Sequence, residues 1–174
     1  RVLESATTAS HSIDSSVNSL ALTAGEQCSF NVFVNQIGAT TRYIYLFNND
    51  GATDQLAKFE LTGDGVVGYT ANLDVAKITK LSLGWYKIEI QWEQANTGTA
   101  SVSIGTSTTL NDATLTHLGD ITYGFYTYLA NFHRGSTSRF GKNQEVSWWG
   151  TGTQSSENSV IVPSLDLPNY RENP

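Results

Sequence analysis

The sequence predicts an all-β protein, a two-layer antiparallel β-sandwich of the jelly-roll type. Residues 83–92 open on a glycine turn and then alternate Tyr86, Ile88, Ile90 and Trp92 with polar residues, which is the period of two of a half-buried strand. Short segments of this kind recur with turn signals between them, and no amphipathic helical pattern of about ten residues or more appears. Because a sheet with one apolar face needs a second layer on it, a sandwich follows.

The bulk composition fits one domain over residues 1–174 and excludes some partners. Charged residues make up 15% of the chain and the formal net charge is −6, so no basic surface for nucleic acid is expected. No apolar run reaches the roughly 18 residues that membrane insertion needs. The chain has no Met and no signal peptide, so we expect a processed product or, preferably, a piece of a larger protein.

The first half of the chain supplies three expected strands. Residues 11–13 are expected to form an edge strand. In residues 28–35, side chains that are expected to point inward alternate with side chains that are expected to point outward, and Cys28 falls on the inward side. We therefore expect a buried thiol that acts as a small hydrophobic group and not as a redox group. Residues 42–47 are apolar on both faces, which indicates a central strand or one whose second face is covered or used for binding.

The middle of the chain predicts two hairpins. A short strand at 58–61 ends at a glycine-rich turn, and residues 66–71 are expected to pair with it. Residues 96–98 (Asn-Thr-Gly) are expected to close a second hairpin, in which 100–104 returns against the strand that ends at Trp92.

The late region predicts a long polar loop, one more strand and an extension. The loop covers residues 106–116, and the tyrosine-rich segment 121–133 is expected to be the longest late strand. After residue 135 the composition changes to Ser, Thr, Gly and Gln, so residues 135–174 are expected to be a loop-rich C-terminal extension of the same domain.

The sequence shows no catalytic constellation, so we expect no enzyme. The Gly-x-Ser-x-Gly pattern of a nucleophile elbow is absent, and the three histidines lack metal-ligand spacing. Glu89 and Glu93 lie on one strand face, but their separation of about 13 Å exceeds that of a glycosidase pair.

Calcium is the only cofactor that the loops suggest. Asn48, Asp50 and Asp54, or alternatively Asp64, could supply oxygen ligands. Short loops rich in Asn, Asp and Gly are more often plain turns, and that alternative is preferred.

The aromatic residues give the best functional signal. The chain holds eight Tyr and four Trp, and flat rings with a polar tip suit the stacking of sugars. A core or subunit-interface role for the adjacent tryptophans is an open alternative, and so is a site on the 43–47 strand. One late region could combine ring stacking with polar groups, and there Arg134 would suit an acidic sugar. The candidate ligand-binding residues are Trp148, Trp149, Tyr128, Asn131, His133 and Arg134.

Several segments together resemble the jelly-roll, carbohydrate-binding-like modules of bacteriophage tail fibres and tailspikes and of some secreted glycan-active proteins. The resemblance spans residues 11–133. The pieces that carry it are His11-Ser12-Ile13, Thr23-Ala24-Gly25, residues 29–34, residues 59–65, Gly84-Trp85-Tyr86-Lys87-Ile88, Gly119-Asp120 and residues 124–132. The sequence departs from the family at Asn35, Tyr128 and Asn131, and residues after Gly135 do not match.

The resemblance implies a non-catalytic, lectin-like module that recognises a host surface polysaccharide from a phage tail, in the virion or outside the cell. Two alternatives stay open. One is a structural or trimerisation module of the fibre without a ligand, and the other is an accessory carbohydrate-binding module of a secreted enzyme. Since the related fibres are trimeric, the expected assembly is at most a homotrimer.

Overall fold

A computed structural model describes residues 1–38, 42–49 and 53–134, with only the backbone described at 15–20 and 99–100. Within these ranges the chain forms strands and turns, and no helix long and apolar enough to cross a bilayer occurs among them. The strands are β1 (Val2–Leu3), β2 (Thr8–Leu22), β3 (Gln27–Ile37), β4 (Tyr43–Asn49), β5 (Asp54–Glu60), β6 (Val66–Ala71), β7 (Val75–Lys80), β8 (Tyr86–Glu93), β9 (Gly98–Ser107), β10 (Thr116–Leu118) and β11 (Gly124–Arg134).

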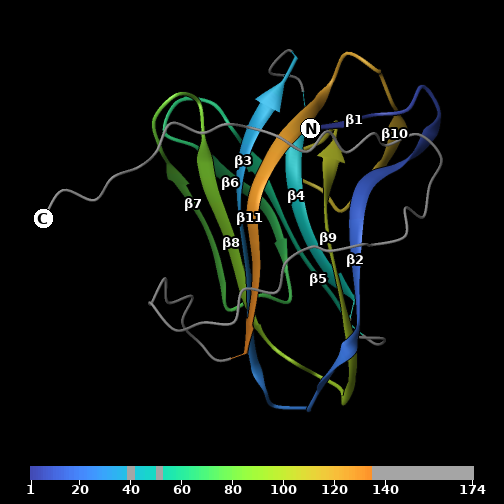
Figure 1. The fold of residues 1–174 in the computed structure, drawn as a ribbon, viewed down its shortest axis with the longest axis vertical. Coiled ribbons are helices and arrows are strands. Elements are labelled where there is room, and N and C mark those ends of the chain that lie inside the picture. The colour runs from blue at the N-terminus through green and yellow to red at the C-terminus, as the bar shows by residue number, and fades with distance from the viewer. Residues whose placement is uncertain (39–41, 50–52, 135–174) are drawn as a thin grey trace, which may run out of the picture.

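The strands form two antiparallel sheets packed face to face, so the predicted β-sandwich is confirmed. The five-stranded sheet has the order β1-β11-β3-β8-β7, and the six-stranded sheet has the order β10-β2-β9-β4-β5-β6. In Figure 1, β7 and β8 (green) lie at one side of the molecule and β2 (blue) lies at the other, with β11 (orange) running between them along the long axis.

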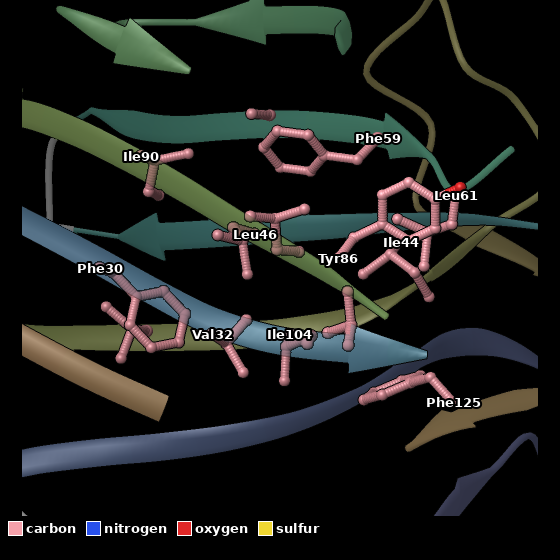
Figure 2. Close-up of a cluster of buried hydrophobic side chains, with 14 of the residues drawn as sticks. Phe30, Val32, Ile44, Leu46, Phe59, Leu61, Tyr86, Ile90, Ile104 and Phe125 are labelled. Carbon is pink, nitrogen blue, oxygen red and sulfur yellow. The ribbon is translucent and has the colours of Figure 1, made fainter. Parts of the chain in front are cut away.

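Alternate side chains from both sheets fill the space between them. Figure 2 shows Phe30 and Val32 of β3 facing Ile44 and Leu46 of β4, with Ile104 of β9 beside them. The predicted inward positions of β3 and β8 are confirmed, because these side chains are at most 4% exposed: Cys28, Phe30, Val32, Val34, Tyr86, Ile88, Ile90 and Trp92. Burial raises the pKa of the Cys28 thiol to about 12, so the thiol stays protonated and unreactive.

The turn between β7 and β8 has the geometry of a type I′ hairpin. Leu83 (φ 58°) and Gly84 (φ 76°) are both left-handed, and the Trp85 N–H donates to the Ser82 carbonyl at 3.2 Å. Glycine fits this conformation, whereas leucine is strained in it. The Asn35 side chain donates to the Leu83 carbonyl at 3.1 Å, which anchors the strained residue to β3.

The expected hairpin at residues 96–98 is wrong. β8 pairs with β3 and β7, whereas β9 pairs with β2 and β4 in the other sheet. The segment therefore crosses from one sheet to the other instead of closing a hairpin. Short spacing and turn residues favour a hairpin locally, but each strand already has two partners in its own sheet, and all of these except β7 lie far away in the sequence. The pairing of β5 with β6 is confirmed.

Two other expectations concern the six-stranded sheet. Residues 11–13 lie in β2 and pair with β9 alone, because the short β10 pairs only with residues 8–10, so this stretch has one strand neighbour, as expected for an edge. β4 is a central strand, as expected. Its outward-facing Tyr45 is 1% exposed, and the ring lies where a side chain at Gly105 would stand, with its hydroxyl 3.0 Å from Ser10 Oγ. The chain itself thus buries Tyr45, and no partner subunit is needed for that.

Ile90 tests the packing of the two sheets. Ile90→Ala removes methyl groups from a side chain that is 0% exposed, so the free energy of unfolding should fall by about 2–5 kcal/mol in urea titrations. The control is Leu83→Ala, at a side chain that is 86% exposed, and a change within about 0.5 kcal/mol is expected there. Equal effects for the two variants would contradict the sandwich core.

Candidate functional site on the outer face of the five-stranded sheet

The outer face of the five-stranded sheet is the surface turned away from the core. Its residues alternate with the core residues of β3, β8, β7 and β11, and they are mostly polar or aromatic. We call the following set the outer face: Gln27, Ser29, Asn31, Phe33, Val75, Lys77, Thr79, Lys87, Glu89, Gln91, Glu93, Tyr126, Tyr128, Asn131 and His133.

A β-bulge in β11 brings three of the predicted ligand-binding residues onto this face. Tyr128 lies opposite Phe33 and Asn131 lies opposite Asn31, so two residues of β11 stand against one of β3 and a single residue of β11 is extra. Leu129, within the bulge, is left-handed at φ 46°. Bulges re-aim side chains in this way, and here Tyr128, Asn131 and His133 all come to the same side.

Phe33 and Tyr128 form an aromatic pair at the centre of the neighbouring strands β3 and β11. They are direct cross-strand partners, a position in which side chains lie close enough to act together. Tyr128 is 47% exposed, so a broad part of its ring is accessible. Such a pair has the flat apolar surface that stacking on a sugar requires.

Asn31 and Ser29 are the most unusual residues of the outer face. Both are 0% exposed, and neither the Asn31 amide oxygen, its amide nitrogen nor the Ser29 hydroxyl has a hydrogen-bond partner. In the strand registers Asn31 stands between Asn131 on β11 and Glu89 on β8. A buried polar group without a partner destabilises a fold by about 1–3 kcal/mol, so these three groups require an explanation.

Charged groups on the outer face hold one another in place. Lys87 Nζ lies 3.0 Å from Glu89 Oε2, and Gln91 donates to Glu89 Oε1 at 2.7 Å. The pKa of His133 is lowered, first because burial disfavours its charged form, with Glu89 opposing and Lys87 adding to the shift. The imidazole is therefore mainly neutral at pH 7.

The remaining predicted residues do not join this face in the described structure. Arg134 lies in register with the inward-facing Cys28, and its guanidinium bonds the Ala21 carbonyl and pairs with Glu26 at 3.2 Å. Trp148 and Trp149 lie outside the described residues.

Sequence reasoning missed three residues of the outer face. Phe33 carried a usable signal, because it is an aromatic residue out of phase with Phe30, Val32 and Val34. Ser29 and Asn31 carried none, since polar residues at alternating positions are what an ordinary solvated strand face shows. Their burial and their lack of partners depend on the tertiary structure.

A second polar cluster, which the sequence did not suggest, lies at one end of the sandwich and joins four segments. Glu4 accepts from Arg42 Nε at 2.9 Å, from His117 Nε2 at 3.2 Å and from the Asp120 N–H at 2.9 Å. Burial alone would raise the pKa of Glu4, but these hydrogen bonds outweigh it and lower the pKa to about 2. Glu4 is therefore a permanent anion in neutral solution.

Both histidines of this cluster have hydrogen-bond partners at each ring nitrogen. His117 Nδ1 lies 3.1 Å from the Leu115 carbonyl, and its Nε2 lies 3.2 Å from the Glu4 carboxylate. His11 Nε2 faces the carbonyls of Thr7 and His117, while its Nδ1 faces the Ser5 N–H. The cluster thus fastens the N-terminal segment to residues 115–120 and to Arg42.

A buried lysine organises the loop at residues 108–115. Lys58 is 0% exposed, and its ammonium donates to Ser107 Oγ at 2.8 Å, to the Thr109 carbonyl at 2.9 Å and to the Thr114 carbonyl at 2.6 Å. Asp112 adds its carboxylate at 3.5 Å. Burial lowers the pKa of Lys58, and Asp112 opposes the shift. Since every proton of the ammonium has an acceptor, its role is to hold the loop on the sheet.

The loops proposed for calcium do not come together as a site. Asn48 points into the sandwich and donates to Gln55 at 2.6 Å, while Asp54 accepts from Asn49 at 2.7 Å and Asp64 pairs with Lys80 at 3.5 Å. Asp50 lies outside the described residues. Within the described part of the chain, no group of three or more His, Cys, Asp or Glu side chains could hold a metal ion.

Comparison with known proteins gives no assignment. The chain matches no protein-family model, and no curated protein sequence is significantly similar to it.

Glu4 makes the acid stability of the fold testable. Its folded pKa of about 2 lies below its ordinary value of 4.5, so its contribution to stability is complete above about pH 5 and is lost as the pH falls toward 2. Glu4→Gln should therefore lower the free energy of unfolding by about 3 kcal/mol at pH 7. In denaturant titrations at several pH values, the gap to the wild type should close between pH 5 and 2.

The matched control is Asp14→Asn, at an exposed carboxylate that accepts only from the Ser12 hydroxyl. It should change stability by less than about 0.5 kcal/mol. A Glu4→Gln effect that stays constant between pH 7 and pH 2 would contradict the role of the Glu4 charge.

Proposed function

We propose that this chain is a non-catalytic glycan-binding module that holds a surface polysaccharide on the outer face of its five-stranded sheet. The observation that carries the proposal is the ring of Tyr128, which is 47% exposed and which the bulge in β11 places on the same face as Asn131 and His133. An accessible ring beside polar side chains is what a sugar ring, apolar on its faces and hydroxylated at its rim, requires.

The setting that we propose is a bacteriophage tail fibre or tailspike, in which the module helps the virion recognise its host. This part rests on the sequence resemblance over residues 11–133, and the sandwich fold is compatible with it. A fold alone does not determine a function. Trp148 and Trp149 remain predicted contributors to binding, and a homotrimer remains the expected largest assembly.

The proposal assigns no catalysis to the outer face. Both oxygens of Glu89 are engaged, one by Lys87 and one by Gln91, so neighbouring side chains of the sheet hold this carboxylate in place. An acid and a base at the separations that glycosidases use would be needed for hydrolysis. The purified chain is accordingly expected to release no reducing ends from polysaccharides that it binds.

Tyr128 and a matched tyrosine test the location of the site. A glycan array followed by titration calorimetry should find binding in the millimolar to micromolar range, about −4 to −8 kcal/mol. Tyr128→Ala should weaken this binding at least tenfold, about 1.4 kcal/mol, because the stacking surface is lost. Tyr69→Ala, on β6 of the other sheet, should leave affinity unchanged. Equal effects would place the site elsewhere, and an array without any binding would favour a structural module of the fibre.

Asn31 tests whether its buried amide serves the fold. Asn31→Val removes a buried amide that has no partner and places a β-branched residue in a strand. The free energy of unfolding should stay the same or rise by about 1–3 kcal/mol in urea titrations, and glycan binding should stay within twofold because the amide is 0% exposed. A clear loss of stability would show that the amide serves the fold.

A further inference from the structure

We propose that the open edge of β11 is the docking site for a segment of this chain's own C-terminal region, residues 159–162, which adds one strand to the five-stranded sheet. The interaction is backbone pairing at the side of the sandwich and involves no ligand. It therefore stands or falls independently of the proposed glycan binding.

β11 has a strand neighbour on only one side along most of its length. β3 pairs with it on that side, whereas β1 reaches only Gly124 and Phe125 on the other. The backbone groups of residues 126–134 that point away from β3 have no strand partner in the part of the chain that the structure describes. The bulge around Leu129 interrupts this edge, so its regular part is Asn131–Arg134. These four residues are open to pairing with a further strand.

The outermost strands at the opposite side of the sandwich carry features that block such pairing. β7 ends the five-stranded sheet and presents the exposed lysines Lys77 and Lys80, which disfavour the addition of another strand. β6 ends the six-stranded sheet, and there the Tyr69 N–H already bonds the Leu110 carbonyl at 2.8 Å. Residues 126–133 of β11 contain no Lys, Asp, Glu or Pro, so the β11 edge lacks this protection.

The core is incompletely covered beside the open edge. The ring of Phe132 lies 5.8 Å from that of Trp92, but Phe132 is only partly buried, whereas its β3 partner Phe30 is 0% exposed. Ile13, on β2 of the other sheet, packs against the core and is also only partly buried. An apolar strand laid along β11 would cover the open side of Phe132, because cross-strand neighbours on one face lie in contact.

The chain continues from the foot of this edge. The Arg134 guanidinium bonds the Ala21 carbonyl of β2 and pairs with Glu26 at 3.2 Å, so the end of β11 is held beside the end of β2. Both strands, β11 (orange) and β2 (blue), run toward this end in Figure 1. A segment that returns from it is antiparallel to β11, which is the direction that short connections allow. Covalent attachment also gives that segment a high effective concentration at the edge.

Residues 159–162 (Ser-Val-Ile-Val) match the open edge in length and in chemistry. Three consecutive β-branched residues favour a strand, and Pro163 ends it. Because alternate residues of a strand point to the same face, at least one apolar side chain lies over Phe132 in either phase. The other apolar segment, residues 146–149, has no such run, since Ser147 interrupts it.

Proline substitutions in the full chain test the pairing. Val160→Pro and Ile161→Pro each remove one backbone N–H, and because successive N–H groups point to opposite edges, one of the two removes a bond to β11. In that variant, hydrogen exchange followed by NMR should show those amides of residues 131–134 that do not bond β3 exchanging at least about tenfold faster than in the wild type. Amides of β8, which is paired on both sides, should keep their protection and verify that the sandwich is folded.

Ser155→Pro is the matched control, because it places the same residue in a polar stretch of the same region. Exchange at residues 131–134 should then stay within about twofold of the wild type. Ser147→Pro makes the corresponding change in the other apolar segment and should behave like the control.

Three results would overturn the proposal. Unprotected amides at residues 131–134 in the wild-type chain would show that the edge stays open, and this measurement needs no variant. Protection that is lost in Ser147→Pro but survives both Val160→Pro and Ile161→Pro would assign the edge to residues 146–149. Protection that appears only as the protein concentration rises, together with a dimer in light scattering, would identify the occupant as a second copy of the chain.

Discussion

The structure depends on strict alternation along β3, the middle strand of the five-stranded sheet. Cys28, Phe30, Val32 and Val34 point into the sandwich and are fully buried, so the residues between them must point outward. A shift of one residue would place four apolar side chains outside and bury the polar set instead. The register of β3 with β8 and β11 therefore decides both the core and the composition of the outer face. The same constraint that builds the sandwich thus positions the candidate site.

Much of the fold could be predicted from the sequence, because alternation is a local property. The inward positions of β3 and β8 and the central place of β4 are confirmed. The connection at residues 96–98 shows where local reasoning ends. Its Asn-Thr-Gly sequence is compatible with a hairpin, but Trp92 is already in register with Cys28 of β3, and β9 completes the other sheet. Which strands pair is decided by how both sheets close around one core, and no short segment records that.

The candidate site was predictable only in part, for a related reason. Tyr128, Asn131 and His133 share a face because of a bulge at Leu129, and simple alternation through 128–133 would have separated Tyr128 from the other two. Asn31 and Ser29 look like ordinary solvated residues in the sequence. Their unusual property is burial without hydrogen bonds, which depends on the neighbouring strands. Polar residues in strands therefore need the tertiary structure before a role can be assigned to them.

Lys58 has a consequence for the conditions under which the molecule keeps its shape. Its ammonium group donates to oxygens of residues 107–114 and is covalently part of the chain, so it cannot leave the loop as a bound ion can. This anchor is lost only when the ammonium loses its proton, and burial brings that loss closer because it lowers the pKa of Lys58. Alkaline conditions are therefore the ones that would release the loop from the sheet.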